Sequence, residues 1–169
     1  MSHRRTRASP QPRILDRIDR RILNSLQADG RQSVSRLARE VHLSTSPCGD
    51  RVRRLEDDGF IQGYTAIIDH RLLGARLLAF IGVRVDRTDA RTFQQFSDML
   101  ATFAEVIECH MVAGDFDYFL KVRVADIGAY RQFLDERLER LPGVTQTHTF
   151  LAMKEVKSAT RLMKAAALR

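Results

Sequence analysis

The sequence predicts an α+β protein with two domains: an N-terminal winged helix-turn-helix and a C-terminal ferredoxin-like βαββαβ domain. Residues 16–58 contain three amphipathic helical patterns in close succession, and residues 77–156 alternate strand and helix patterns in the order β-α-β-β-α-β. The charge is also uneven, because residues 1–68 hold thirteen arginines, no lysine and eight acidic residues, whereas the remainder is nearly balanced. An Arg-biased segment joined to a near-neutral one is typical of a nucleic-acid-binding module attached to a second domain.

The first predicted helix begins at Asp16, whose carboxylate is a good N-cap. Asp19 lies in the first turn, where a negative charge interacts favourably with the helix dipole. Asp29-Gly30 ends the helix. Its apolar stripe consists of Ile18, Ile22 and Leu26.

The second and third predicted helices are separated by the turn at residues 42–44. Ser33 caps the second helix, whose apolar stripe is Leu37, Ala38 and Val41. Ser44 is expected to cap the third, and Pro47 is tolerated in its first turn because amides there have no intrahelical acceptor. Gly59 is expected to end it. Two helices joined by so short a turn are typical of a helix-turn-helix motif, whose second helix enters the DNA major groove.

The third helix separates its residues by face. At about 100° per residue, Cys48, Val52 and Leu55 share one side, and polar residues occupy the other. Short hydrogen-bonding groups near the start and arginines further along suit contacts with base edges and phosphates. An ordinary amphipathic helix in a small bundle is the alternative. The predicted DNA contacts are Ser44, Thr45, Ser46, Asp50, Arg51, Arg53 and Arg54.

The predicted domain boundaries follow from changes in composition. Residues 1–13 are rich in Arg, Ser and Pro without acidic residues, which predicts a disordered basic arm. The winged helix-turn-helix is assigned to residues 14–68, with a short strand or wing after Gly59. A linker at 69–76, a ferredoxin-like domain at 77–156 and a C-terminal tail at 157–169 complete the chain.

The second domain is predicted to contain four strands and two helices. The strands are expected at 77–85, 105–114, 118–124 and 144–156, and the helices at 89–103 and 126–141. The second strand is apolar on both faces, which predicts that a second sheet packs against the first, in a dimer at least. The alternating residues are Val106, Ile107, Cys109, His110, Met111 and Val112.

The composition also bears on cofactors and location. Cys48 and Cys109 are far apart, lie in apolar patterns and belong to no Cys/His cluster, so we expect two reduced core residues and neither metal nor cofactor. No apolar run is long enough to span a membrane and no signal peptide is visible, which predicts a cytoplasmic protein.

Four segments carry a resemblance to the Lrp/AsnC family: LDRIDRRILNSLQADGR (15–31), SPCGDRVRRLEDDGFIQGYTA (46–66), ECHMVAGDFDY (108–118) and LPGV (141–144). The resemblance covers roughly residues 14–164 in continuous order. It implies a transcription regulator that binds double-stranded DNA, associates with the nucleoid and responds to a small amino acid, leucine or another. It further implies homodimers that assemble into octamers, with the effector bound between dimers.

The family's effector pocket involves the turn after the second strand, which here is Gly114, Asp115, Phe116, Asp117 and Tyr118. Backbone amides exposed by the glycine suit a carboxylate, and the acidic groups suit an ammonium. The alternative is that both aspartates only make Asx-turn hydrogen bonds. Thr149, Phe150 and Ala152 are expected to form the facing wall. Close relatives often have Tyr-Val-Val at 150–152, and a bulkier residue at Gly49, so the effector and the operator are left open.

Two other functions are compatible with parts of the sequence. Sirohaem decarboxylases resemble the same two-domain architecture, and His110 and His148 are candidate haem or acid/base groups there. A lone histidine in a strand is more often structural, and the Arg-rich helix favours DNA, so no catalytic residue is predicted. An architectural nucleoid protein without an effector is the third interpretation.

Overall fold

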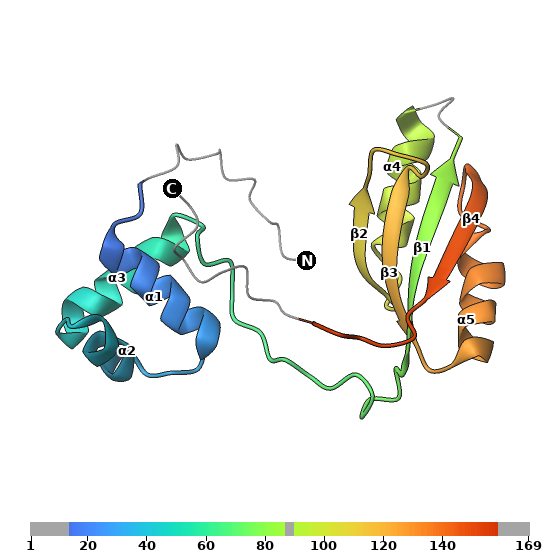
Figure 1. Ribbon diagram of the computed structural model, residues 1–169. Coiled ribbons are helices and arrows are strands. Elements are labelled where there is room, and N and C mark those ends of the chain that lie inside the picture. The colour runs from blue at the N-terminus through green and yellow to red at the C-terminus, as the bar shows by residue number, and fades with distance from the viewer. Residues whose placement is uncertain (1–13, 87–89, 159–169) are drawn as a thin grey trace. The chain divides into compact units, whose positions relative to one another are not determined.

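The computed structural model describes residues 14–86 and 90–158 (Figure 1). The chain forms two compact units, the first ending at Ile67 and the second running from Ile68 to Lys157. The sequence predicted a domain boundary after residue 68, which is one residue later than the boundary after Ile67 in the structure. The predicted basic arm at 1–13 and almost all of the predicted tail at 157–169 lie outside the described residues.

The first unit contains the three expected helices, α1 (Arg17–Ala28), α2 (Val34–Val41) and α3 (Thr45–Asp57). The predicted caps of the first two are confirmed. Asp16 accepts a hydrogen bond from the Asp19 amide at 2.7 Å, and Ser33 accepts one from the Arg36 amide at 3.2 Å. The three apolar stripes meet in one core, in which α3 is anchored by its inner face. The buried core residues are Ile22, Leu37, Ala38, Val41, Cys48, Val52 and Leu55.

The turn between α2 and α3 depends on a left-handed residue. His42 ends α2 with φ 60° and ψ 48°. The next amide, that of Leu43, donates to the Ala38 carbonyl at 2.9 Å. A residue with a Cβ is strained in this region of backbone space. His42 thus ends α2 and opens the short turn that leads to α3.

Ser44 occupies the N-cap position of α3, but its side chain makes no capping hydrogen bond. The predicted cap is therefore wrong in its chemistry. An N-cap side chain commonly bonds to the amide three residues on, and that residue is Pro47, which has no N–H.

The predicted wing strand is not formed in the described part of the chain, where residues 60–69 carry no strand. The segment instead returns along the helices. The Ile61 amide donates to the Leu55 carbonyl at 3.0 Å, and the Tyr64 hydroxyl donates to Glu56 at 2.9 Å. Predicted linker residues 69–76 include a turn in which the Ala75 amide bonds to the His70 carbonyl.

The second unit has the predicted β-α-β-β-α-β order. Its strands are β1 (Leu77–Val85), β2 (Val106–Met111), β3 (Tyr118–Val124) and β4 (Val144–Leu151). They form one sheet in the order β2-β3-β1-β4, with every neighbouring pair antiparallel. The helices are α4 (Ala90–Leu100) and α5 (Ile127–Phe133), and α5 continues as one π-helical turn, η1 (Leu134–Leu138).

Two strands are shorter than predicted, because a strand extends only where a neighbour pairs with it. β4 pairs with β1 up to Leu151, and the Ala152 amide makes the last bond, to the Leu78 carbonyl. β2 ends at Met111, opposite Tyr118, where β3 begins.

The helices cover one face of the sheet and leave the other face open (Figure 1). Alternate residues of β1 and β3, such as Ile81 and Leu120, are buried under α4 and α5. Phe80 and Phe119 lie on the open face, with their ring centroids 5.9 Å apart. Cys109 is paired with Leu120 on the covered side but lies on an edge strand and is exposed, so its predicted place in the core is wrong.

Candidate DNA interface and ligand-binding turn

The outward face of α3 presents short polar residues and arginines. Ser46, Asp50, Arg53 and Arg54 are exposed, opposite the buried side of the helix. Arg53 donates to the Asp50 carboxylate at 2.6 Å, with the two side chains 73% and 64% exposed. An exposed ion pair of this kind contributes little stability, so Arg53 can exchange it for a DNA contact at small cost.

Arg51, which the sequence analysis predicted as a DNA contact, is directed toward α1. Its guanidinium donates to Asp16 at 2.6 Å and to the wholly buried Asp19 at 2.7 Å. These two hydrogen bonds raise the pKa of Arg51, whereas the hydrogen bond from the Asp19 amide, followed by Arg51, lowers the pKa of Asp16. We therefore correct the role of Arg51 to a link between α3 and α1.

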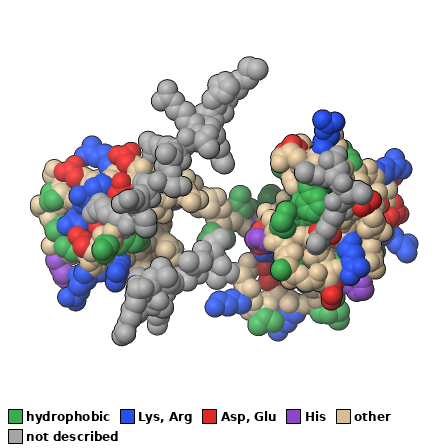
Figure 2. All heavy atoms as spheres, turned by 90° about the horizontal axis from the view of Figure 1, so that it is seen from above, with side chains coloured by type: hydrophobic (Ala, Val, Ile, Leu, Met, Phe, Trp, Pro, Cys, Tyr) green, Lys and Arg blue, Asp and Glu red, His purple; other side chains and the backbone are tan. Residues whose placement is uncertain are grey.

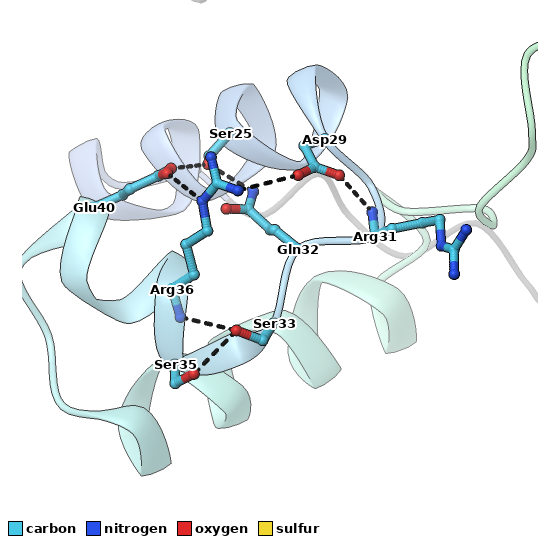
Figure 3. A network of polar contacts seen from close by, with 8 residues as sticks. All are labelled: Ser25, Asp29, Arg31, Gln32, Ser33, Ser35, Arg36 and Glu40. Atoms are coloured by element: carbon cyan, nitrogen blue, oxygen red, sulfur yellow. Dashed lines mark hydrogen bonds and ion pairs between the residues drawn. The ribbon is translucent and has the colours of Figure 1, made fainter.

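A polar network that sequence reasoning missed holds α2 against α1 (Figure 3). Arg36 contacts the Glu40 carboxylate at 3.3 Å and Asp29 at 3.6 Å, and Glu40 also accepts from the Ser25 hydroxyl. The hydrogen bond from Ser25, followed by Arg36, lowers the pKa of Glu40. Gln32 donates to Ser25 at 2.7 Å. The network crosses the corner between the two helices and so helps to fix the orientation of the motif.

Charges of both signs are intermixed on the side of the first unit that Figure 2 shows. The excess of arginine in this part of the chain therefore does not form one continuous basic patch on that side.

The turn between β2 and β3 is tied to the sheet by Asp117, which is only 7% exposed. Its carboxylate accepts from the Val85 amide at 2.9 Å, and its own amide donates to the Val83 carbonyl at 3.0 Å. Asp117 therefore ties the turn to β1 through a bond to a residue 32 positions away, and not through the local Asx-turn bond considered as the alternative. Asp115 is exposed, and its carbonyl accepts from the Arg84 side chain at 2.6 Å.

Phe116 folds back from the turn onto the open face of the sheet. It lies directly over Gly82, where an added Cβ would stand 2.6 Å from the ring. Phe116 and Phe150 both contact the His148 ring, at centroid distances of 5.9 and 5.1 Å. Gly82 is thus required for the turn to lie flat on the sheet.

The predicted effector residues separate into two groups. Gly114, Asp115, Phe116 and Phe150 lie on the turn or on the open face. Tyr118 packs inward against Phe96, at a centroid distance of 4.6 Å, and Thr149 pairs with the Tyr130 hydroxyl in the covered core. Ala152 is half-buried beyond the end of β4. Tyr118 and Thr149 therefore do not line a site on the open face.

The two histidines considered as haem or acid/base groups are not brought together. His110 is on β2 and His148 on β4, the two opposite edges of the sheet. Within the residues that the structure describes, no three His, Cys, Asp or Glu side chains gather as a metal site would require. Over the same residues, no helix has the length and apolar character needed to cross a bilayer.

A helix-turn-helix with an exposed polar recognition face, followed by a separate ferredoxin-like domain, defines a DNA-binding regulator that carries a second, sensory domain. Family models agree with this class over both units. A winged helix-turn-helix DNA-binding model matches residues 15–62, and the Lrp/AsnC ligand-binding domain matches residues 78–162. The chain belongs to the Lrp/AsnC family of transcription regulators.

Individual relatives are similar over nearly the whole chain. The leucine-responsive regulatory protein of Escherichia coli K12 is 52% identical over 149 residues, covering 88% of this chain and 91% of that protein. A Neisseria meningitidis transcriptional regulator, solved as a complex with L-methionine, is 32% identical with a TM-score of 0.85, covering 89% and 97% of the two chains. An AsnC-family regulator from Agrobacterium tumefaciens is 34% identical with a TM-score of 0.86, covering 91% and 100%.

Proposed function

We propose that this protein regulates transcription by binding operator DNA through α3, and that a small apolar amino acid bound by its second domain alters its assembly or its DNA affinity. The observation that carries the proposal is the exposed polar face of α3 on a buried apolar stripe, in a chain that joins this motif to a ligand-binding domain. The proposed site of action of the protein is the cytoplasm, on DNA of the nucleoid.

The proposed DNA contacts lie along the exposed side of α3. The Ser44 hydroxyl makes no capping bond, and the amides of Thr45 and Ser46 open the helix. Helix N-termini attract phosphate through their unpaired amides and their dipole. Arg53 and Arg54 lie further along and supply base or phosphate contacts. Asp50 holds Arg53 in the free protein.

The proposed dimer forms through the open face of the sheet. We define the aromatic face as Phe80, Phe116, Phe119, His148 and Phe150, whose rings follow one another at centroid distances of 5.1 to 6.4 Å. A second copy is the proposed occupant, because the rings are at least partly exposed in the single chain, with Phe150 46% exposed, and an ion pair lies beside them. Lys121 and Glu108 pair there at 2.9 Å. An apolar centre with a charged rim is typical of protein interfaces, and a twofold axis would place like surfaces together. Assembly of dimers into octamers is proposed from the family resemblance.

The proposed effector is an amino acid with an unbranched or γ-branched apolar side chain. One relative is named for its response to leucine, and two solved relatives, from Neisseria meningitidis and Mycobacterium tuberculosis, hold L-methionine. In this chain, the exposed Asp115 carboxylate suits the ammonium group and the turn at Gly114 suits the carboxylate.

Calorimetry with leucine, methionine and alanine tests the effector, with alanine as the control that lacks the long side chain. We expect leucine or methionine to bind, to raise the apparent unfolding temperature, and to change DNA affinity measured by fluorescence anisotropy. DNA binding without amino-acid binding would instead support an architectural protein. We propose no enzymatic activity, because the matched DNA-binding model and the similar curated proteins are those of transcription regulators.

A further inference from the structure

Gly49 lies within the recognition helix at a position where no neighbouring group in the described part of the domain would exclude a larger side chain. It is the fifth residue of α3, which runs from Thr45 to Asp57. Among the described residues outside the helix backbone and its chain neighbours, a Cβ added at Gly49 would meet only Cγ1 of Val34, at 3.6 Å. This is an ordinary van der Waals distance, so an alanine fits here and gains a contact.

Glycine in a helix interior is destabilising by roughly 0.5–1 kcal/mol relative to alanine. The cost at Gly49 is not offset by closer packing within the domain. Other glycines of this chain do have an internal reason, since Gly82 makes room for Phe116 and Gly59 ends α3 at φ 79°. Because the domain has room for a Cβ at Gly49, the glycine indicates that a group from another molecule approaches the helix backbone closely there.

Gly49 lines a groove of about 570 Å³ within the first unit, between α2, α3 and Tyr64. We call it the α3 groove. Its lining combines apolar side chains with hydroxyls, the Gln32 amide and a guanidinium, and with the carboxylate of Glu56, which accepts a hydrogen bond from the Tyr64 hydroxyl. Leu37 and Val52 are among the apolar side chains, and Thr45, Ser46 and Arg53 among the polar ones. Val34, which is 40% exposed, forms the wall beside Gly49.

We propose that the α3 groove receives the edge of a base pair in the DNA major groove, with the C5-methyl group of a thymine seated over Gly49. The thymine methyl is the apolar group that the major groove presents, and an apolar contact discriminates in its favour. The polar side chains of the lining then contact neighbouring polar edges or phosphates. Gly49 is thereby a specificity-determining residue, and this inference rests on the proposed sequence-specific DNA binding.

The test begins with the full-length protein and a pool of random DNA duplexes, from which wild type selects its preferred site. Each thymine of that site is then replaced by deoxyuridine, which removes only the methyl group. For one thymine in each half-site, we expect wild-type affinity to fall about fourfold per half-site, the effect of losing one buried methyl. Gly49→Ala should bind the thymine site more weakly, and its affinity should no longer depend on that methyl.

Two measurements separate this result from misfolding or a general loss of binding. Gly49→Ala should unfold at a higher temperature than wild type, and it should bind random duplex as wild type does. Gly128→Ala, which alters a helical glycine in the second domain, should keep the full dependence on the thymine methyl.

Three outcomes would overturn the inference. These are a lower unfolding temperature for Gly49→Ala, an equal loss of affinity on all duplexes, or a selected site in which no thymine methyl is coupled to Gly49. If wild type enriches no sequence at all, sequence-specific binding itself fails and the inference falls with it. The selection step therefore distinguishes the two failures.

Discussion

The carboxylate of Asp117 accepts a hydrogen bond from the backbone amide of Val85 at 2.9 Å, in a buried position 32 residues away in sequence. The bond reaches β1 where its pairing with β4 shifts register, between Arg84 and Val85. Asp117 thus satisfies a backbone amide at an irregularity of the sheet, and it attaches the turn between β2 and β3 to that point.

Asp117→Ala should lower the free energy of unfolding by about 1–3 kcal/mol, because it leaves the buried Val85 amide without its acceptor. Urea denaturation checks it, with the exposed Asp115→Ala as the matched control, expected within about 0.5 kcal/mol of wild type. Equal effects of the two variants would contradict the structural role.

Arg51→Ala should destabilise the first unit by about 1–3 kcal/mol, since it removes a partner of the fully buried Asp19. Asp16 adds a pH dependence, because the hydrogen bond from the Asp19 amide and, after it, the one from Arg51 lower its pKa. The pKa of Asp16 is lower in the folded protein, so its contribution is present above the ordinary value of 3.8 and is lost as the pH falls through the folded value. Thermal unfolding from pH 6 to pH 3 should therefore show a smaller acid-induced decrease in Arg51→Ala than in wild type.

Arg53→Ala should leave stability nearly unchanged, because the Arg53–Asp50 pair is exposed. If Arg53 reads a base, affinity for the selected operator should fall by about 1–3 kcal/mol while random duplex is unaffected. If it holds a phosphate, all sequences should weaken alike and the salt slope should decrease by about one unit. Anisotropy titrations at several salt concentrations separate these results, and unchanged binding throughout would remove Arg53 from the interface.

His42→Gly should raise the free energy of unfolding by about 1 kcal/mol, because glycine adopts the left-handed conformation without a Cβ clash. The matched control is His42→Ala, which retains a Cβ and should bring no comparable gain. Urea denaturation curves of wild type and the two variants give the three free energies of unfolding to be compared. A gain of equal size in both variants would show that the imidazole, not the backbone, is responsible.

Phe150→Asp should prevent dimer formation, because it places a charge in the centre of the aromatic face, where Phe150 is 46% exposed in the single chain. Sedimentation velocity at micromolar concentration should give a dimer or larger assembly for wild type and a monomer for the variant. Glu136→Gln, on the exposed side of η1, serves as the control. A well-folded wild-type monomer would contradict the proposed role of the open face.

The sequence by itself determined the elements and their order. Hydrophobic periodicity and capping residues such as Asp16 and Ser33 are local signals, so they placed α1, α2 and α3 and the βαββαβ order correctly. The same periodicity assigned one face of each element to the core, which is why Cys48, Val52 and Leu55 were identified as the buried side of α3.

Only the tertiary structure decided what each polar residue contacts. Arg51 and Arg53 are two residues apart and chemically identical, but one reaches the buried Asp19 on α1 and the other is exposed with Asp50. Asp115 and Asp117 share a turn, but only Asp117 meets an amide of β1. The partners of Arg51 and Asp117 each lie 32 residues away in the chain. Short-range patterns carry no information about which distant group will stand opposite a side chain, because packing of whole elements sets that distance.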